Sequence, residues 1–128
     1  MTFLLDTHAL LWAIINPESL SRKASTVIDD DASEILVSAA SAWEIATKVR
    51  LGKLLRAEAL ERDFLNVLEQ LGYALLSIEA ETALRAGRLT GGHGDPFDRI
   101  IAAQALALDI PVISADTTLD LFGVRRIW

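Results

Sequence analysis

Hydrophobic positions in this chain alternate between short uninterrupted runs and longer stretches with helical spacing. Apolar runs of strand length occupy residues 2–5, 35–37, 74–76 and 111–114, with a possible fifth at 124–127. Helical spacing covers residues 9–15, 19–28, 39–52, 57–71, 79–86 and 96–108, and a short helical turn is expected at 116–121. This alternation predicts an α/β fold, with a mostly parallel sheet of four to five strands and helices on both faces.

Acidic residues follow several of these strands or fall in the first turn of the helix that comes next. Asp6 and Asp116 each follow a strand and could cap the following helix. Ser41 and Glu44 match a capping box, and Lys48 has the spacing to pair with Glu44 along the helix. Each of these acids therefore has a purely structural explanation.

The stretch from Asp95 to Ala105 combines a helix start with two carboxylates. Asp95 is a plausible N-cap and Pro96 suits the first helical position. Asp98 lies in the first turn, where a negative charge meets the positive end of the helix dipole. The same position would also let Asp98 present its carboxylate to a cation, and the local sequence leaves both roles open.

Taken together, the acids suggest more than capping. Parallel sheets bind ligands beyond the carboxyl ends of their strands. Carboxylates that converge there would repel one another unless a cation neutralised them. Hard oxygen ligands suit Mg²⁺ or Mn²⁺, and such a site would support metal-assisted phosphodiester hydrolysis. The four acids in question are Asp6, Glu44, Asp98 and Asp116.

The composition narrows the range of functions. With 128 residues, 52% of them hydrophobic, the chain is expected to form one domain with a substantial core. A formal net charge of -6 does not favour nucleic-acid binding through the overall field, so RNA would need a local basic patch. The lack of cysteine leaves carboxylate and imidazole as metal ligands. No apolar run of about 18 residues or signal-like start occurs, so we expect a cytoplasmic protein without membrane insertion.

Four segments of the sequence resemble the motifs of PIN-domain proteins, specifically VapC-type toxins of type II toxin–antitoxin pairs. They are residues 4–12, 37–45, 93–99 and 113–116, and the likeness runs in the same order from Phe3 to Trp128. The resemblance implies a single PIN-like nuclease domain over residues 1–128. It also implies a Mg²⁺- or Mn²⁺-dependent ribonuclease that a cognate antitoxin inhibits. Its acidic site would match Asp6, Glu44, Asp98 and Asp116.

Several further residues are candidates for supporting roles. Asp95 is expected to cap its helix, to hold a metal-bound water, or both. Thr7 and Ser114 could hydrogen-bond site carboxylates or could simply cap helices. Arg99 could contact a phosphate or pair with an acid, and His93 could take part in proton transfer or be a loop residue. The densest basic segment is a candidate RNA-backbone strip or an exposed helix end, and it contains Lys48, Arg50, Lys53 and Arg56.

Other functions remain to be weighed. A receiver-type signalling module would need a phosphoacceptor aspartate after its third strand, where Leu75-Leu76-Ser77 stands. A phosphatase of the haloacid dehalogenase type would need an aspartate where His8 stands. A PIN-fold protein that binds RNA or a partner without catalysis is the more serious alternative. The apolar share of the composition, together with the family likeness, also predicts a homodimer.

Overall fold

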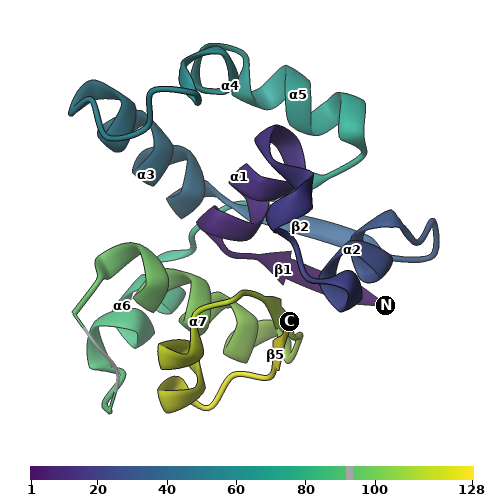
Figure 1. The fold of residues 1–128 in the computed structure, drawn as a ribbon. Helices are drawn as coiled ribbons and strands as arrows, with labels where there is room; N and C mark the ends of the chain where they lie inside the picture. Colours follow the sequence, from purple (N-terminus) through teal and green to yellow (C-terminus); the bar gives the residue numbers. More distant parts are fainter. Residues whose placement is uncertain (92–93) are drawn as a thin grey trace.

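A five-stranded parallel sheet forms the centre of the computed structural model, which describes residues 1–91 and 94–128 (Figure 1). The strand order is β3-β2-β1-β4-β5, and every neighbouring pair is parallel. The strands are β1 (Thr2–Leu5), β2 (Glu34–Ser38), β3 (Ala74–Leu76), β4 (Val112–Ile113) and β5 (Arg126–Ile127). The predicted α/β fold with a parallel sheet is confirmed, including the fifth strand.

The strand order brings three carboxyl ends together at the middle of the sheet. The chain runs outward from β1 through β2 to β3, then crosses back to β4 on the other side of β1. Leu5 is paired with Val37 of β2 and with Ile113 of β4. The order in which the chain adds strands to the sheet therefore reverses beside β1. Open parallel sheets form their ligand sites at the carboxyl ends of the strands at such a point.

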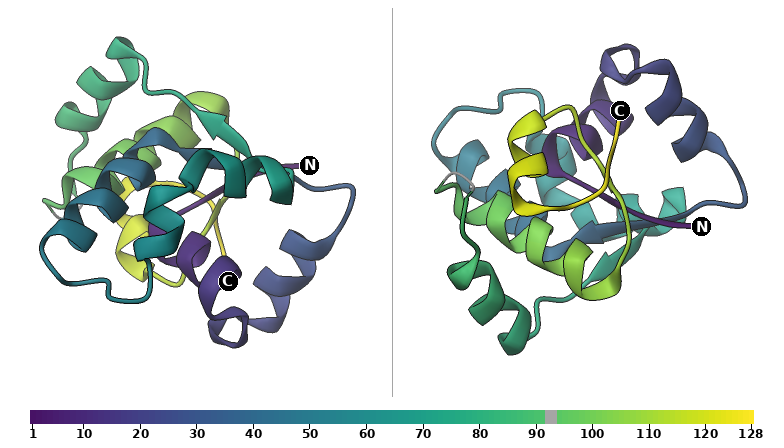
Figure 2. Two further views of the ribbon diagram at one scale, coloured as in Figure 1. Left: turned by 90° about the horizontal axis from the view of Figure 1, so that it is seen from above. Right: turned by 90° about the horizontal axis from the view of Figure 1, so that it is seen from below.

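Alternate residues of the strands pack into two separate cores. Phe3 and Leu5 contribute to one core, which also contains residues of the helices α1 (Thr7–Ile15), α2 (Arg22–Asp29), α3 (Ala39–Arg50), α4 (Glu58–Arg62) and α5 (Phe64–Leu71). Leu4 contributes to the other, together with residues of α7 (Pro96–Leu108) and of the 3-10 helix η2 (Thr117–Phe122). Figure 2 shows the side covered by α4 and α5 (teal, left view) and the side covered by α7 and η2 (green and yellow, right view). The sheet is thus covered on both faces, as its apolar strands require.

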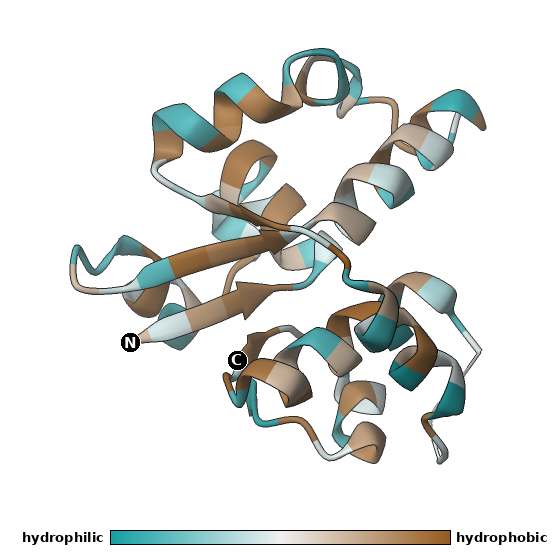
Figure 3. Cartoon of the chain, turned by 180° about the vertical axis from the view of Figure 1, so that it is seen from behind, coloured by the Kyte–Doolittle hydropathy of each residue, from teal (hydrophilic) through white to brown (hydrophobic). Residues whose placement is uncertain are grey.

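The helices are amphipathic coverings of this sheet. In Figure 3 β1 and β2 are mainly brown, whereas most helices carry both brown and teal residues. The helices are α1 (Thr7–Ile15), α2 (Arg22–Asp29), α3 (Ala39–Arg50), α4 (Glu58–Arg62), α5 (Phe64–Leu71), α6 (Ala80–Arg88) and α7 (Pro96–Leu108), with 3-10 helices η1 (Pro17–Ser19) and η2 (Thr117–Phe122). Across residues 1–91 and 94–128, no helix combines the length and the apolar character that a membrane span requires.

Two predicted helices differ from those in the structure. The predicted helix 57–71 is divided into α4 and α5 at Asp63, whose backbone leaves helical angles at φ -120° and ψ 28°. Aspartate competes for backbone hydrogen bonds and so favours helix ends. The predicted helix 19–28 begins later, because Leu20 is extended and Ser21 caps α2 by accepting from the Ala24 amide at 3.0 Å.

Candidate functional site

A cavity of about 380 Å³ lies where the chain leaves β1, β2 and β4. Its acidic lining consists of Asp6, Glu44, Asp95, Asp98 and Asp116. Thr7, His8, Lys48 and Thr118 are the other described residues that line it. The structure thus brings the four acids singled out in the sequence around one cavity, although they come from four different segments of the chain. Their role as catalytic and metal-binding residues stays a prediction.

Asp6 is held rigidly at the end of β1. It is 4% exposed, and as the predicted N-cap of α1 its Oδ1 accepts a hydrogen bond from the Ala9 amide at 2.8 Å. Its Oδ2 accepts a hydrogen bond from the Ser114 hydroxyl. Burial raises the pKa of Asp6, and nearby Asp116 raises it further, while the bonds from Ser114 and Ala9 act in the opposite direction.

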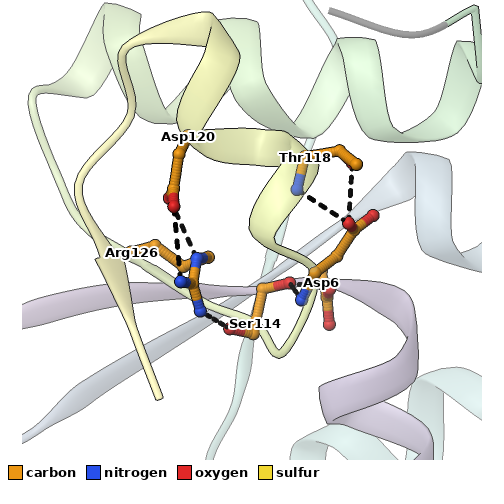
Figure 4. A network of polar contacts seen from close by, with 6 residues as sticks. Asp6, Ser114, Thr118, Asp120 and Arg126 are labelled. Atoms are coloured by element: carbon orange, nitrogen blue, oxygen red, sulfur yellow. Dashed lines mark hydrogen bonds and ion pairs between the residues drawn. The ribbon is translucent and has the colours of Figure 1, made fainter.

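Ser114 connects Asp6 to the loop after β4. Its buried hydroxyl also accepts from the Asp116 amide at 2.9 Å, and its carbonyl accepts from Arg126 Nη1 at 3.0 Å. Arg126 is in turn held by Asp120, with Nε and Oδ1 2.9 Å apart (Figure 4). The predicted support of a site carboxylate by Ser114 is therefore seen as a hydrogen bond, although Ser114 itself does not line the cavity.

Asp116 is the N-cap of η2, and its side chain is held by hydrogen bonds from Thr118. Its Oδ1 accepts from the Thr118 amide at 3.0 Å and from the Thr118 hydroxyl at 2.6 Å. The predicted capping role of Asp116 is confirmed. The same carboxylate lines the cavity, so capping and a role in the site are compatible.

Glu44 is a buried carboxylate whose two oxygens differ in their contacts. It is 4% exposed, and its Oε2 lies 2.5 Å from Lys48 Nζ, as their helical spacing predicted. Among residues 1–91 and 94–128, Oε1 finds no hydrogen-bond partner. A buried carboxylate oxygen left in this state costs free energy, which a bound cation or donor would recover.

The predicted capping box around Glu44 is wrong. The N-cap of α3 is Ser38, whose hydroxyl accepts from the Ala40 amide at 3.0 Å. Helix α3 begins directly after β2, three residues earlier than the capping box required, so Ser41 lies inside the helix. Its buried hydroxyl instead shares a hydrogen bond of 2.9 Å with Thr7, which ties α3 to the start of α1.

Asp98 lies in the first turn of α7 and lines the cavity together with the other acids. The predicted cap of this helix is confirmed, since Asp95 Oδ1 accepts from the amides of Phe97 at 2.9 Å and Asp98 at 3.1 Å. Burial raises the pKa of Asp98 to about 7, with further contributions from Asp95, Asp6, Glu44 and Asp116. The other acids are therefore close enough to raise the pKa of Asp98.

The oxygen atoms around the cavity are chemically suited to a divalent cation, but their side chains are not drawn together into a compact set of ligands. Within residues 1–91 and 94–128, no three carboxylate or imidazole groups form a compact metal-binding cluster. However, the available ligands are hard oxygens, Glu44 Oε1 has no partner in the described part of the chain, and Asp98 has a raised pKa. These are the features expected when several carboxylates surround a site whose positive charge is supplied from outside.

The other candidate residues are distributed more widely. Arg99 does not line the acid cavity; its guanidinium donates to the carbonyls of Ala86, at 3.0 Å, and Leu89 at the end of α6. His93 lies outside the described residues. Lys48 lines the acid cavity, whereas Lys53 and Arg56 line a separate groove of about 460 Å³. Arg50 lines neither of these two cavities and is exposed.

Three residues of the site were not recognised as such in the sequence. The sequence favoured a helix-surface position for His8 over a role in proton transfer or phosphate contact; the residue is exposed, and it lines both the acid cavity and the neighbouring groove. Thr118 lies two residues after a capping aspartate, and hydrogen bonds between side chains and backbone at this spacing are a recurring local motif. The sequence could therefore have identified Thr118 as a support of Asp116. Arg126 acts through a contact 12 positions away in the sequence, and no local pattern would have revealed it.

Fold and cavity together define a class of small α/β proteins with an acid-lined site at the switch point of a parallel sheet. More particularly, the chain belongs to the PIN domain family, whose model matches residues 3–124. The family assignment and the strand order, which differs from the 2-1-3-4-5 order of receiver-type modules, exclude the signalling alternative.

Solved structures with the same fold include toxin–antitoxin complexes. VapBC2 from Rickettsia felis, bound to a promoter DNA fragment, superposes with a TM-score of 0.73 at 14% identity, covering 99% of this chain and 98% of that chain. DNA-bound VapBC from Salmonella typhimurium gives 0.72 at 18% identity, covering 99% and 97%. FitAcB from Neisseria gonorrhoeae gives 0.63 at 19% identity, covering 98% and 96%. No curated protein matches the sequence significantly.

Proposed function

We propose that this chain is a divalent-metal-dependent ribonuclease that acts as the toxin of a toxin–antitoxin pair. The observation that carries the proposal is the acid cavity, in which one carboxylate oxygen of the buried Glu44 has no hydrogen-bond partner among the described residues. Membership of the PIN domain family supports nuclease chemistry at this position. The fold shared with VapBC complexes supports the toxin role.

Mg²⁺ or Mn²⁺ would be held by the carboxylates of Asp6, Glu44, Asp98 and Asp116. When bound, such an ion supplies an activated water and stabilises the leaving oxygen of a phosphodiester. Ser114 and the Ala9 amide fix the orientation of the Asp6 carboxylate, and Thr118 does the same for Asp116. Asp98, whose pKa is raised to about 7, would release its proton on binding the cation, because a metal ligand must be deprotonated.

Protein partners form the second part of the proposal. The structural neighbours are described as VapBC and FitAcB complexes, which supports an antitoxin partner for this chain. Large apolar side chains on the surface support a homodimer, among them Trp43 at 56% and Leu65 at 66% exposure. Light scattering that found only monomer at micromolar concentration would contradict the dimer.

The nuclease proposal is tested with purified protein and an RNA substrate. Cleavage is expected with Mg²⁺ or Mn²⁺ and should stop when a chelator is added. Asp6→Asn and Asp98→Asn should each lower the rate by at least about 100-fold, because each removes a charged oxygen ligand. Asp31→Asn, on an exposed loop, is the matched control and should cleave normally. Full activity of Asp6→Asn would show that the site is elsewhere.

A catalytically silent binding protein remains the alternative, favoured by the absence of a compact ligand cluster among residues 1–91 and 94–128. It predicts RNA or partner binding that does not change on addition of Mn²⁺ and no cleavage at any metal concentration. The same preparation distinguishes the two functions, since binding and cleavage can be followed on one labelled RNA.

A further inference from the structure

Lys48 supplies a positive charge to the acid cavity. Among the described residues that line this cavity, it is the one lysine or arginine side chain. Its Nζ lies 2.5 Å from Glu44 Oε2, and the side chains of Lys48 and Glu44 are 32% and 5% exposed. The ammonium thus reaches from a partly open position inward to a buried carboxylate.

This contact differs from an ordinary ion pair on a helix surface. Pairs with spacing i, i+4 are common there and contribute little to stability. Glu44, however, is buried, and within residues 1–91 and 94–128 its Oε1 has no partner. A charge buried in this way is costly unless a counter-ion offsets it. Lys48 fulfils that requirement for Glu44 when no metal is bound.

The other acids of the cavity make the positive charge of Lys48 more important. Asp6, Asp95, Asp98 and Asp116 line the same cavity as Glu44. Their mutual repulsion opposes the folded arrangement, and a lysine charge reduces it. A metal ion would meet the same positive charge with the opposite consequence, because cation and ammonium are drawn to the same carboxylate.

We propose that Lys48 is a built-in counter-ion of the acid cavity, which stabilises Glu44 in the metal-free protein and competes with the divalent cation. The inference rests on the proposed metal site and describes how the chain regulates it. A flexible four-carbon stem and partial exposure allow the ammonium to withdraw toward solvent. Lys48 therefore lowers the affinity of the site for metal.

The test compares Mn²⁺ binding by the wild type, Lys48→Met and Lys48→Gln, measured as free Mn²⁺ by electron paramagnetic resonance. Met keeps the apolar stem, while Gln keeps a hydrogen-bond donor without the charge. Both variants should bind Mn²⁺ about 10-fold more tightly, because a unit charge a few ångströms from the ion has been removed. Lys53→Met is the matched control, since Lys53 does not line the acid cavity, and its affinity should be unchanged.

A second measurement does not depend on activity or on the binding isotherm. In chelator, Lys48→Met should unfold at a lower temperature than the wild type, because Glu44 loses its counter-ion. Saturating Mn²⁺ should raise the melting temperature of the variant by more than that of the wild type. If Lys48→Met does not fold, Lys48→Gln provides the same comparison with a donor retained.

The outcomes separate this inference from the proposed function. If the wild type binds Mn²⁺ and the Lys48 variants bind it equally or more weakly, the counter-ion role is overturned while the metal site stands. If neither the wild type nor any variant binds Mn²⁺, the metal-dependent function fails and the inference fails with it. Tighter binding by both Lys48 variants, with Lys53→Met unchanged, supports both.

Discussion

The hydroxyl of Ser114 donates a hydrogen bond to Oδ2 of Asp6, a residue 108 positions earlier in the chain. The two residues follow adjacent parallel strands, β4 and β1, so the contact depends on the sheet rather than on local sequence. The same hydroxyl accepts from the Asp116 amide at 2.9 Å. One buried hydroxyl therefore fixes the relative positions of two acids of the proposed site.

Ser114→Ala should weaken the proposed metal site without unfolding the protein. Loss of the donor raises the pKa of Asp6 further, because that hydrogen bond opposes the effect of burial. We expect metal affinity or cleavage to fall by about 10- to 100-fold, as is usual when a residue that orients a metal ligand is removed. The acidic limb of the pH–rate profile should move to higher pH.

The control for this experiment is Ser25→Ala, which removes an exposed serine–aspartate hydrogen bond of 3.4 Å between Ser25 and Asp29. It should leave affinity, rate and pH profile unchanged. An unaltered pH–rate profile in Ser114→Ala would contradict the proposed influence of Ser114 on the protonation of Asp6.

Asp98 should make the metal-free protein less stable as the pH rises toward neutrality. Its pKa is raised from the ordinary value of 3.8 to about 7 in the folded state. Between these two values the folded chain holds a proton that the unfolded chain has released, so the free energy of unfolding falls with increasing pH. Urea denaturation in chelator at pH 5 and pH 8 measures this contribution.

Asp98→Asn provides the comparison, because it removes the titrating group while keeping similar size. Its stability should change less between pH 5 and pH 8 than that of the wild type. Mn²⁺ binding by the wild type should tighten over the same interval as the Asp98 proton is lost. An equal pH dependence of stability in the variant and wild type would show that Asp98 is not the group responsible.

Sequence reasoning located the acids and one of their supports, Ser114, but not Thr118 or Arg126. Asp6, Asp95 and Asp116 were predicted as helix caps because capping depends on a few neighbouring residues, and all three cap as expected. Their approach around one cavity followed from strand ends meeting in a parallel sheet. The caps can be predicted from a few neighbouring residues, and the parallel sheet from the periodicity of the hydrophobic positions.

The remaining features depend on packing between distant segments. Ser41 was expected to cap α3, but its hydroxyl bonds to Thr7, which the fold brings beside it. The division of helix 57–71 at Asp63 was equally hidden, because hydrophobic spacing continues across the break. Arg99 and Arg126 bind carbonyls that the tertiary structure brings next to them, so the charge of the two arginines could not identify these partners.

Arg126→Gln should destabilise the protein by about 1–2 kcal/mol, the cost of losing charge-assisted hydrogen bonds. Arg126 binds Asp120 and donates to the carbonyl of Ser114 at 3.0 Å, with its side chain 19% exposed. Arg125→Gln is a closely matched control, since Arg125 is 59% exposed and pairs with an exposed Asp109. Thermal denaturation should show a loss in the first variant and little change in the second. Equal melting temperatures would remove Arg126 from the support of the site.

Arg99→Met should test whether this arginine serves the fold or the substrate. Its guanidinium donates to carbonyls at the end of α6, where helical acceptors lack partners within the helix. It also lies 5.5 Å from the centre of the Phe122 ring. The contacts predict a loss of about 2 kcal/mol in stability, measured by urea denaturation.

Arg85→Met is the control for Arg99, because Arg85 lies in the last turn of α6 and is exposed. It should cost less than about 0.5 kcal/mol. The decisive comparison is RNA cleavage at a low temperature at which both variants are folded. If Arg99 acts only by joining α6 to α7, Arg99→Met cleaves at nearly the wild-type rate there. A large loss of cleavage by folded Arg99→Met would instead restore the phosphate-binding role suggested by the sequence, because it would show that the guanidinium acts on the substrate.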